Sequence, residues 1–81
     1  MIYGPGNAHG ASVRVAETGE ELKGVMLVDT DAGIVTRTHL PARLNAEGDK
    51  VETFDDRFEA IHAIQGMEPR PVLFICYGRL A

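Results

Sequence analysis

The sequence predicts a β-rich α+β fold that combines a small antiparallel meander, one short helix or extra strand, and a buried C-terminal strand. Two apolar, β-branched runs flank the polar turn at 29–33, and residues 12–16 alternate between apolar and polar side chains. Residues 72–77 form an unbroken apolar run of strand length. The 81 residues suffice for one small domain, 1–81.

The first half of the chain predicts the meander. Residues 1–10 contain three glycines and a proline, which favours a flexible arm. Short strands are expected at 12–16, 25–28 and 34–39. Gly33 can adopt a positive φ in the turn before the third of these strands. Three sequential strands joined by tight turns are typical of an antiparallel meander, here over residues 12–39.

In the second half of the chain, the signals for secondary structure are clearer at the two ends than in the middle. Pro41 is expected to end the third strand, because proline cannot donate a hydrogen bond to a central ladder. The polar segment 40–50 is then expected to be a mobile connection. The apolar run at 72–77 fits a strand that is central in its sheet, or one that is covered on both faces.

Residues 54–65 fit two kinds of element. The spacing of Phe54, Phe58 and Ile61 places them on one face of a helix, whereas alternation places Phe58, Ala60 and His62 on one face of a strand. Composition favours the helix slightly, and the β-rich context favours the strand. Both alternatives stay open at the level of sequence.

Charge and composition exclude several classes of function. The formal net charge is −4, and the eight Lys and Arg residues are scattered, so we expect no nucleic acid partner. No apolar run approaches the roughly 18 residues of a membrane span, and no secretory signal is recognisable. Cys76 is the only cysteine, which suits a reducing cytoplasm.

No pattern for catalysis, a metal or a cofactor emerges. The acidic turn at 29–33 fails as a calcium loop, because Ile34 stands where the loop needs its glycine. The histidines and Cys76 lack the spacing of a zinc site. Cys76 lies in an apolar run, where burial would raise the pKa of its thiol and make it a poor nucleophile. Asp55 and Asp56 are expected on a solvated face or at a helix start.

The candidate binding residues follow from residue type and place. Tyrosine and arginine are common at interface hot spots, which favours Tyr77 and Arg79 near the end of the chain. The glycine-rich arm and the scattered arginines could together surround a phosphate group. We therefore take five residues as candidates for binding a ligand or a partner: His9, Arg37, His39, Tyr77 and Arg79.

Residues 21–37 read Glu-Leu-Lys-Gly-Val-Met-Leu-Val-Asp-Thr-Asp-Ala-Gly-Ile-Val-Thr-Arg. This segment resembles short, uncharacterised proteins of tailed bacteriophages and prophages. In those proteins a strand runs into Val-Asp-Thr-x-x-Gly and returns through Val-x-Arg. The resemblance implies a phage origin and the cytoplasm of a bacterial host cell, and it implies no activity.

We therefore expect a non-catalytic, phage-type accessory protein that binds and inhibits a bacterial host protein. One alternative is a sponge that sequesters a small phosphorylated, nucleotide-like signalling molecule at an oligomer interface. Another is a small component of the virion or of its assembly. A homo-oligomer would add stability, because so small a domain buries only about 60–65% of the surface of its unfolded chain.

Overall fold

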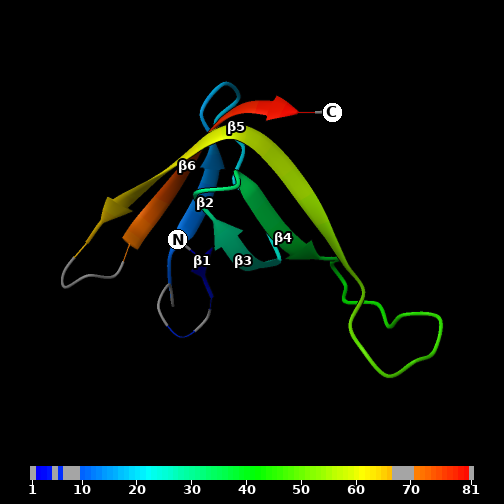
Figure 1. Ribbon diagram of the computed structural model, residues 1–81. Coiled ribbons are helices and arrows are strands. Elements are labelled where there is room, and N and C mark those ends of the chain that lie inside the picture. The colour runs from blue at the N-terminus through cyan, green and yellow to red at the C-terminus, as the bar shows by residue number, and fades with distance from the viewer. Residues whose placement is uncertain (1, 5, 7–9, 67–70, 81) are drawn as a thin grey trace.

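The computed structural model describes residues 2–4, 6, 10–66 and 71–80, and within these ranges it contains six strands and no helix (Figure 1). The strands are β1 (Ile2–Tyr3), β2 (Ser12–Val15), β3 (Val25–Asp29), β4 (Ile34–Thr38), β5 (Thr53–Gln65) and β6 (Pro71–Leu80). They form one sheet in the order β1-β3-β4-β5-β6-β2. The β-rich part of the predicted fold is thus confirmed, whereas no described residue is helical.

The β3–β4 hairpin forms where the sequence predicts it. Val28 pairs with Val35, and Asp29 pairs with Ile34. Gly33 adopts the expected positive φ of 71°. The carboxylate of Asp29 accepts hydrogen bonds from the two backbone N–H groups of residues 31 and 32, each at 3.1 Å. The aspartate therefore stabilises the turn itself, as short polar side chains commonly do.

β5 is a strand, so the helix considered for residues 54–65 is wrong. β5 pairs antiparallel with β4 on one side and with β6 on the other. The side of β5 that faces the core changes along the strand. Residues an odd number of positions apart normally point to opposite faces of a sheet, yet Phe58 and Ile61 are both buried. The change coincides with Gly78 on β6, which has a positive φ of 67°. This switch gives the strand a helix-like spacing of apolar residues.

The meander lies elsewhere than predicted. β3, β4, β5 and β6 pair antiparallel in succession, whereas β2 pairs in parallel with β6, with Ser12 opposite Leu73. A meander that starts at residue 12 is therefore wrong. The connection of residues 16–24, which we call the strap, covers the other edge of β2. Its Glu20 carbonyl accepts from Val15 N–H at 2.9 Å, and Leu22 N–H donates to the Val13 carbonyl at 2.8 Å.

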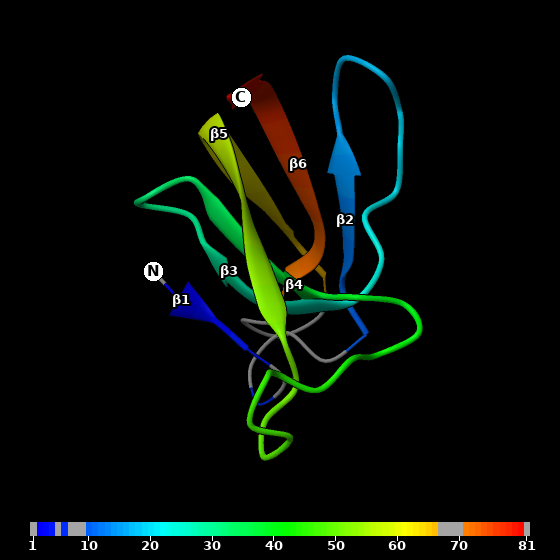
Figure 2. The same cartoon turned by 90° about the vertical axis from the view of Figure 1, so that its right-hand side faces the viewer.

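The sheet curls around the core, with β5 bent along its length (Figures 1 and 2), and this brings β1, at one end of the sheet, into contact with β6. Tyr3 on β1 and Phe74 on β6 have ring centroids 5.1 Å apart, although β3, β4 and β5 lie between these strands in the sheet order. Tyr3 is buried, so Ile2 and Tyr3, at the start of the segment expected to be an arm, form part of the packed structure. The buried side chains of the core are Tyr3, Val13, Val15, Leu22, Val28, Val35, Phe58, Ile61, Phe74 and Cys76.

Candidate functional site

Alternation along three strands brings charged side chains together at one end of the inner face. Arg37 lies two residues after the buried Val35 on β4, and Asp56 lies two residues before the buried Phe58 on β5. Because Val35 pairs with Asp56, Arg37 is a diagonal neighbour of Asp56. Arg79 on β6 pairs with Phe58 and is the corresponding neighbour on the other side.

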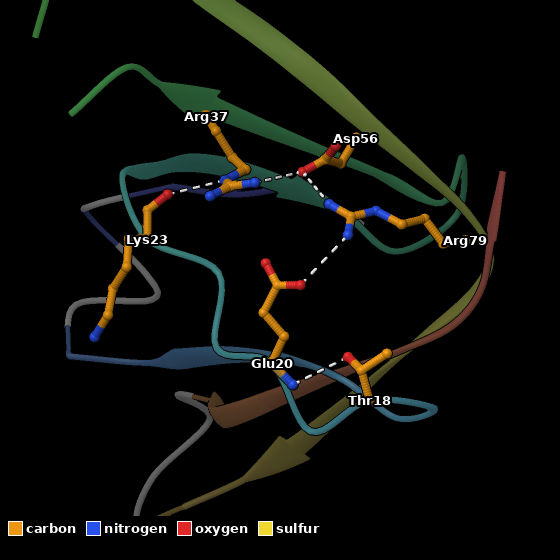
Figure 3. Close-up of polar contacts among 6 residues, drawn as sticks. All are labelled: Thr18, Glu20, Lys23, Arg37, Asp56 and Arg79. Atoms are coloured by element: carbon orange, nitrogen blue, oxygen red, sulfur yellow. Dashed lines mark hydrogen bonds and ion pairs between the residues drawn. The ribbon is translucent and has the colours of Figure 1, made fainter. Parts of the chain in front are cut away.

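The two arginines converge on one carboxylate oxygen (Figure 3). Arg37 Nη1 donates to Asp56 Oδ2 at 2.8 Å, and Arg79 Nη2 lies 3.1 Å from the same oxygen. The side chains of Arg37 and Asp56 are each 17% exposed, and that of Arg79 is 38% exposed. Water therefore screens the Arg37–Asp56 pair less than it screens an ordinary surface ion pair.

Aromatic rings hold both guanidinium groups. The Cζ atom of Arg37 lies 5.2 Å from the centroid of the Phe54 ring, and that of Arg79 lies 5.7 Å from the centroid of Phe58. A guanidinium over the face of an aromatic ring is attracted to the ring electrostatically. The rings thus orient the positive charges at this end of the sheet.

The strap supplies further partners to the two arginines. Arg37 Nε donates to the Lys23 carbonyl at 2.9 Å, and Arg79 Nη1 lies 3.6 Å from Glu20 Oε1 (Figure 3). The Glu20 contact is the longer one, and its side chain is 51% exposed. We call Arg37, Asp56, Arg79 and Glu20 the arginine cluster.

His39 extends the same face beyond β4. Its ring lies 4.9 Å from that of Phe54, measured between centroids. Arg43 Nη2 lies 2.8 Å from His39 Nδ1, and a guanidinium can only donate, so Nδ1 is the acceptor. Nε2 then carries the proton and donates to Glu52 Oε1 at 3.0 Å. His39 therefore links the end of β4 to the segment that leads into β5.

The outer face of β5 and β6 carries a second surface, which contains no lysine, arginine or carboxylate. Ala60 pairs with Tyr77, His62 with Ile75, and Ile64 with Leu73. These six residues point away from the core, because their neighbours Ile61, Phe74 and Cys76 are buried. His62 and Tyr77 make an edge-on ring contact at 5.1 Å. We call this surface of six residues the ribbon face.

The predicted binding residues therefore divide between two surfaces. Arg37, His39 and Arg79 lie on the inner side, and Tyr77 lies on the ribbon face. His9 lies outside the described residues. Asp56 was missed as a site residue: it is a half-buried partner of two arginines, not part of a helix start or of a solvated face. The alternation of Phe54, Asp56 and Phe58 is the signal that would have placed it inside.

Cys76 behaves as the sequence predicts. It is fully buried, and burial raises the pKa of its thiol from 9.0 to about 11. The positive charge of Arg79 opposes this rise, while the negative charges of Asp56 and Glu17 add to it. A thiol with so high a pKa is almost entirely protonated near neutral pH, when it is a poor nucleophile.

Two further findings concern the described ranges alone. No three His, Cys, Asp or Glu side chains there lie in a group that could hold a metal ion. No helix there has the length and apolar character needed to cross a membrane.

Comparisons with known proteins identify no relative of this chain. No family model, no curated protein and no solved structure matches this chain. The case for function therefore depends on the arginine cluster and the ribbon face themselves.

Proposed function

We propose that this protein is a non-catalytic binding protein that docks on a protein partner through the ribbon face. The observation that carries the proposal is an apolar sheet face that no other part of the described chain packs against. Ile64 is 46% exposed and Tyr77 is 40% exposed, although the other face of the same strands is packed into the core. The apolar run at 72–77 suits a strand covered on both faces, and the described residues cover only one of them.

The composition of the ribbon face suits a protein partner. Its six residues include no lysine, arginine or carboxylate, and Tyr77 supplies an aromatic side chain. The centres of protein interfaces are depleted in charge and enriched in aromatic residues. A nucleic acid would instead need a positive surface, which the ribbon face does not offer.

Carboxylate groups lie at the margin of the ribbon face. Gly78, next to Tyr77, donates its N–H to Glu17 Oε1 at 3.0 Å, and a Cβ built on Gly78 would lie 2.7 Å from Glu59 Oε2. Arg14 lies on β2, opposite Ile75 of β6, and its guanidinium is already paired with the Glu21 carboxylate at 3.8 Å. We therefore propose a partner with an apolar patch and basic residues around it.

The resemblance of residues 21–37 to phage proteins makes a bacterial host protein the proposed partner and the host cytoplasm the proposed compartment. Binding through the ribbon face would occupy the partner's surface and would inhibit the partner without a catalytic step. The high pKa of the buried Cys76 thiol supports a role in packing for the one cysteine of the chain.

The test compares variants of similar exposure on the outer side of the sheet. Tyr77→Ser and Ile64→Ser alter the ribbon face, and Leu27→Ser, at a residue that is 43% exposed on β3, is the matched control. We expect the unaltered protein and Leu27→Ser to retain one host protein from a bacterial lysate at near-stoichiometric yield, and the ribbon-face variants to lose it. The purified pair should then bind directly, more slowly as salt is added.

Two results would overturn this proposal. In one, the ribbon-face variants capture the same proteins as the control. In the other, sedimentation shows that the unaltered protein self-associates and that Tyr77→Ser makes it monomeric, so that a second copy covers the face.

A further inference from the structure

The geometry points to a second binding site, on the opposite side of the sheet from the ribbon face: the arginine cluster binds the dianionic phosphoryl group of a small phosphate monoester, which displaces the Glu20 carboxylate. This inference is independent of the proposed protein partner. It rests on Arg37 and Arg79, two guanidinium groups that meet at one carboxylate oxygen of Asp56.

The cluster has more donors and more positive charge than its close partners satisfy. Each guanidinium has five N–H donors in one plane. Within the described residues, their closest acceptors are the Asp56 carboxylate, at 2.8 and 3.1 Å, and the Lys23 carbonyl, at 2.9 Å. Two positive charges thus share one close negative charge, in a place where Arg37 and Asp56 are each only 17% exposed.

Glu20 occupies the position of a displaceable anion. Its carboxylate is 3.6 Å from Arg79 Nη1, beyond ordinary hydrogen-bond range, and its side chain is 51% exposed. Figure 3 shows it reaching toward Arg79 from the strap. The strap stays anchored without this contact, because the Glu17 carboxylate accepts from Gly78 N–H at 3.0 Å and the Lys23 backbone carbonyl accepts from Arg37 Nε. Glu20 can therefore move away while the backbone stays in place.

A phosphate monoester suits the cluster better than a carboxylate does. It carries nearly two negative charges near neutral pH and has three strong acceptor oxygens, whereas Glu20 brings one charge and two oxygens. Planar guanidinium groups held on Phe54 and Phe58 offer paired donors of the kind that bind phosphate in a bidentate way. A nucleic acid backbone is the poorer candidate, because its diesters carry one charge each and the chain has a net charge of −4.

The test uses methyl phosphate, with dimethyl phosphate as the diester, at constant ionic strength. Binding is followed through the side-chain Nε–H signals of Arg37 and Arg79 in NMR spectra. The decisive pair of variants is Glu20→Gln and Glu21→Gln. Both remove one negative charge from the strap, and Glu21 is paired with Lys23 at 3.2 Å instead of with Arg79.

We expect saturable shifts of the Arg79 signal with methyl phosphate and none with dimethyl phosphate. Glu20→Gln should bind methyl phosphate about two- to fivefold more tightly, which is the range expected when a weak exposed ion pair no longer competes. Glu21→Gln should change the affinity by less. Arg79→Gln should abolish binding, and the Glu20 and Glu21 variants keep the test sound if Arg79→Gln fails to fold.

Three results would overturn the inference. The first is the absence of a saturable shift in both the unaltered protein and Glu20→Gln. The second is an equal change in affinity for Glu20→Gln and Glu21→Gln, which would reduce the effect to overall charge. The third is equal binding of the monoester and the diester.

Discussion

Among the described residues, Asp56 is the close anionic partner that Arg37 and Arg79 share, at 2.8 Å from Arg37 and 3.1 Å from Arg79. A half-buried charge without a partner is costly, whereas replacing one member of an exposed contact costs little. The neighbouring Asp55 differs in this respect. It is exposed and accepts one hydrogen bond from the Thr36 hydroxyl at 2.8 Å. Two adjacent aspartates therefore have unequal importance for stability.

Replacing these aspartates tests this inequality. Asp56→Asn should lower the free energy of unfolding by about 1–3 kcal/mol, because it leaves the Arg37 guanidinium half-buried without an anion. Asp55→Asn removes the same charge and keeps an acceptor for Thr36, so it should change that free energy by less than about 0.5 kcal/mol. Urea denaturation of both variants measures the difference. Equal losses would show that the Arg37–Asp56 pair does not stabilise the fold.

At the scale of elements, the backbone of the turn between β3 and β4 lies very close to the backbone of β5. Gly33 has a φ of 71°, and its N–H donates to the Asp29 carbonyl at 2.9 Å. Its own carbonyl accepts from Phe58 N–H at 2.7 Å, which joins the turn to β5. A Cβ on this residue would collide with the Phe58 carbonyl oxygen. Glycine is therefore required here for space as well as for conformation.

Alanine at two glycines separates these two requirements. Gly33→Ala should lower the free energy of unfolding by about 2–4 kcal/mol, because it combines a strained φ with a collision against β5. Gly48→Ala should cost only about 1 kcal/mol, because Gly48 has a similar φ of 75° and open space around it. Thermal or chemical unfolding of the two variants gives the comparison. If both lose the same amount, conformation alone explains the need for glycine at Gly33.

The sequence predicts individual strands better than it predicts their partners. The hairpin at 25–28 and 34–39 was correct to within a residue at each end, because alternation and the Gly33 turn are local signals. The apolar run at 72–77 predicts a central strand as one alternative, and β6 lies between β5 and β2 in the sheet. β5 stayed ambiguous because the switch of inner face between Phe58 and Ile61 produces apolar spacings of four and three residues, as a helix would. That switch becomes visible only with β6 beside it.

The binding surfaces show the same limit. Residue type alone predicts Arg37, His39 and Arg79 as binding residues. No sequence signal places Arg79 near Arg37, because Asp56 on β5 lies between them. The sequence predicts Tyr77 and Arg79 together, because they are only two positions apart. Gly78 separates Tyr77 from Arg79 and has a positive φ. The side chains of Tyr77 and Arg79 therefore lie on opposite faces of the sheet.

At the scale of the whole molecule, the contact of Tyr3 with Phe74 closes the curl of the sheet. The two rings lie 5.1 Å apart, and Tyr3 is buried although β1 has only two residues. β1 joins the sheet through two backbone pairs with β3, which is a small hydrogen-bonded contribution. The side chain of Tyr3, more than the strand itself, therefore attaches this end of the chain to the core.

Truncation of the two β1 side chains tests this view. Tyr3→Ala should lower the free energy of unfolding by about 3 kcal/mol, as the loss of a buried aromatic ring does elsewhere. Ile2→Ala, at a residue that is 60% exposed, should change it by less than about 0.5 kcal/mol. Denaturant titrations of the two variants give both values. A Tyr3→Ala variant as stable as Ile2→Ala would mean that the sheet holds its curl without this contact.

The parallel pairing of β2 with β6 also has a consequence for the growing chain. Ser12 lies opposite Leu73, about 60 positions later, so β2 leaves the ribosome well before its partner exists. At about 5–20 residues per second, the wait lasts roughly 3–12 s. Val13 and Val15, both buried in the finished sheet, have no β6 to pack beside during that time. Synthesis therefore holds this protein in a partly assembled state, open to chaperones and proteases, until β6 emerges.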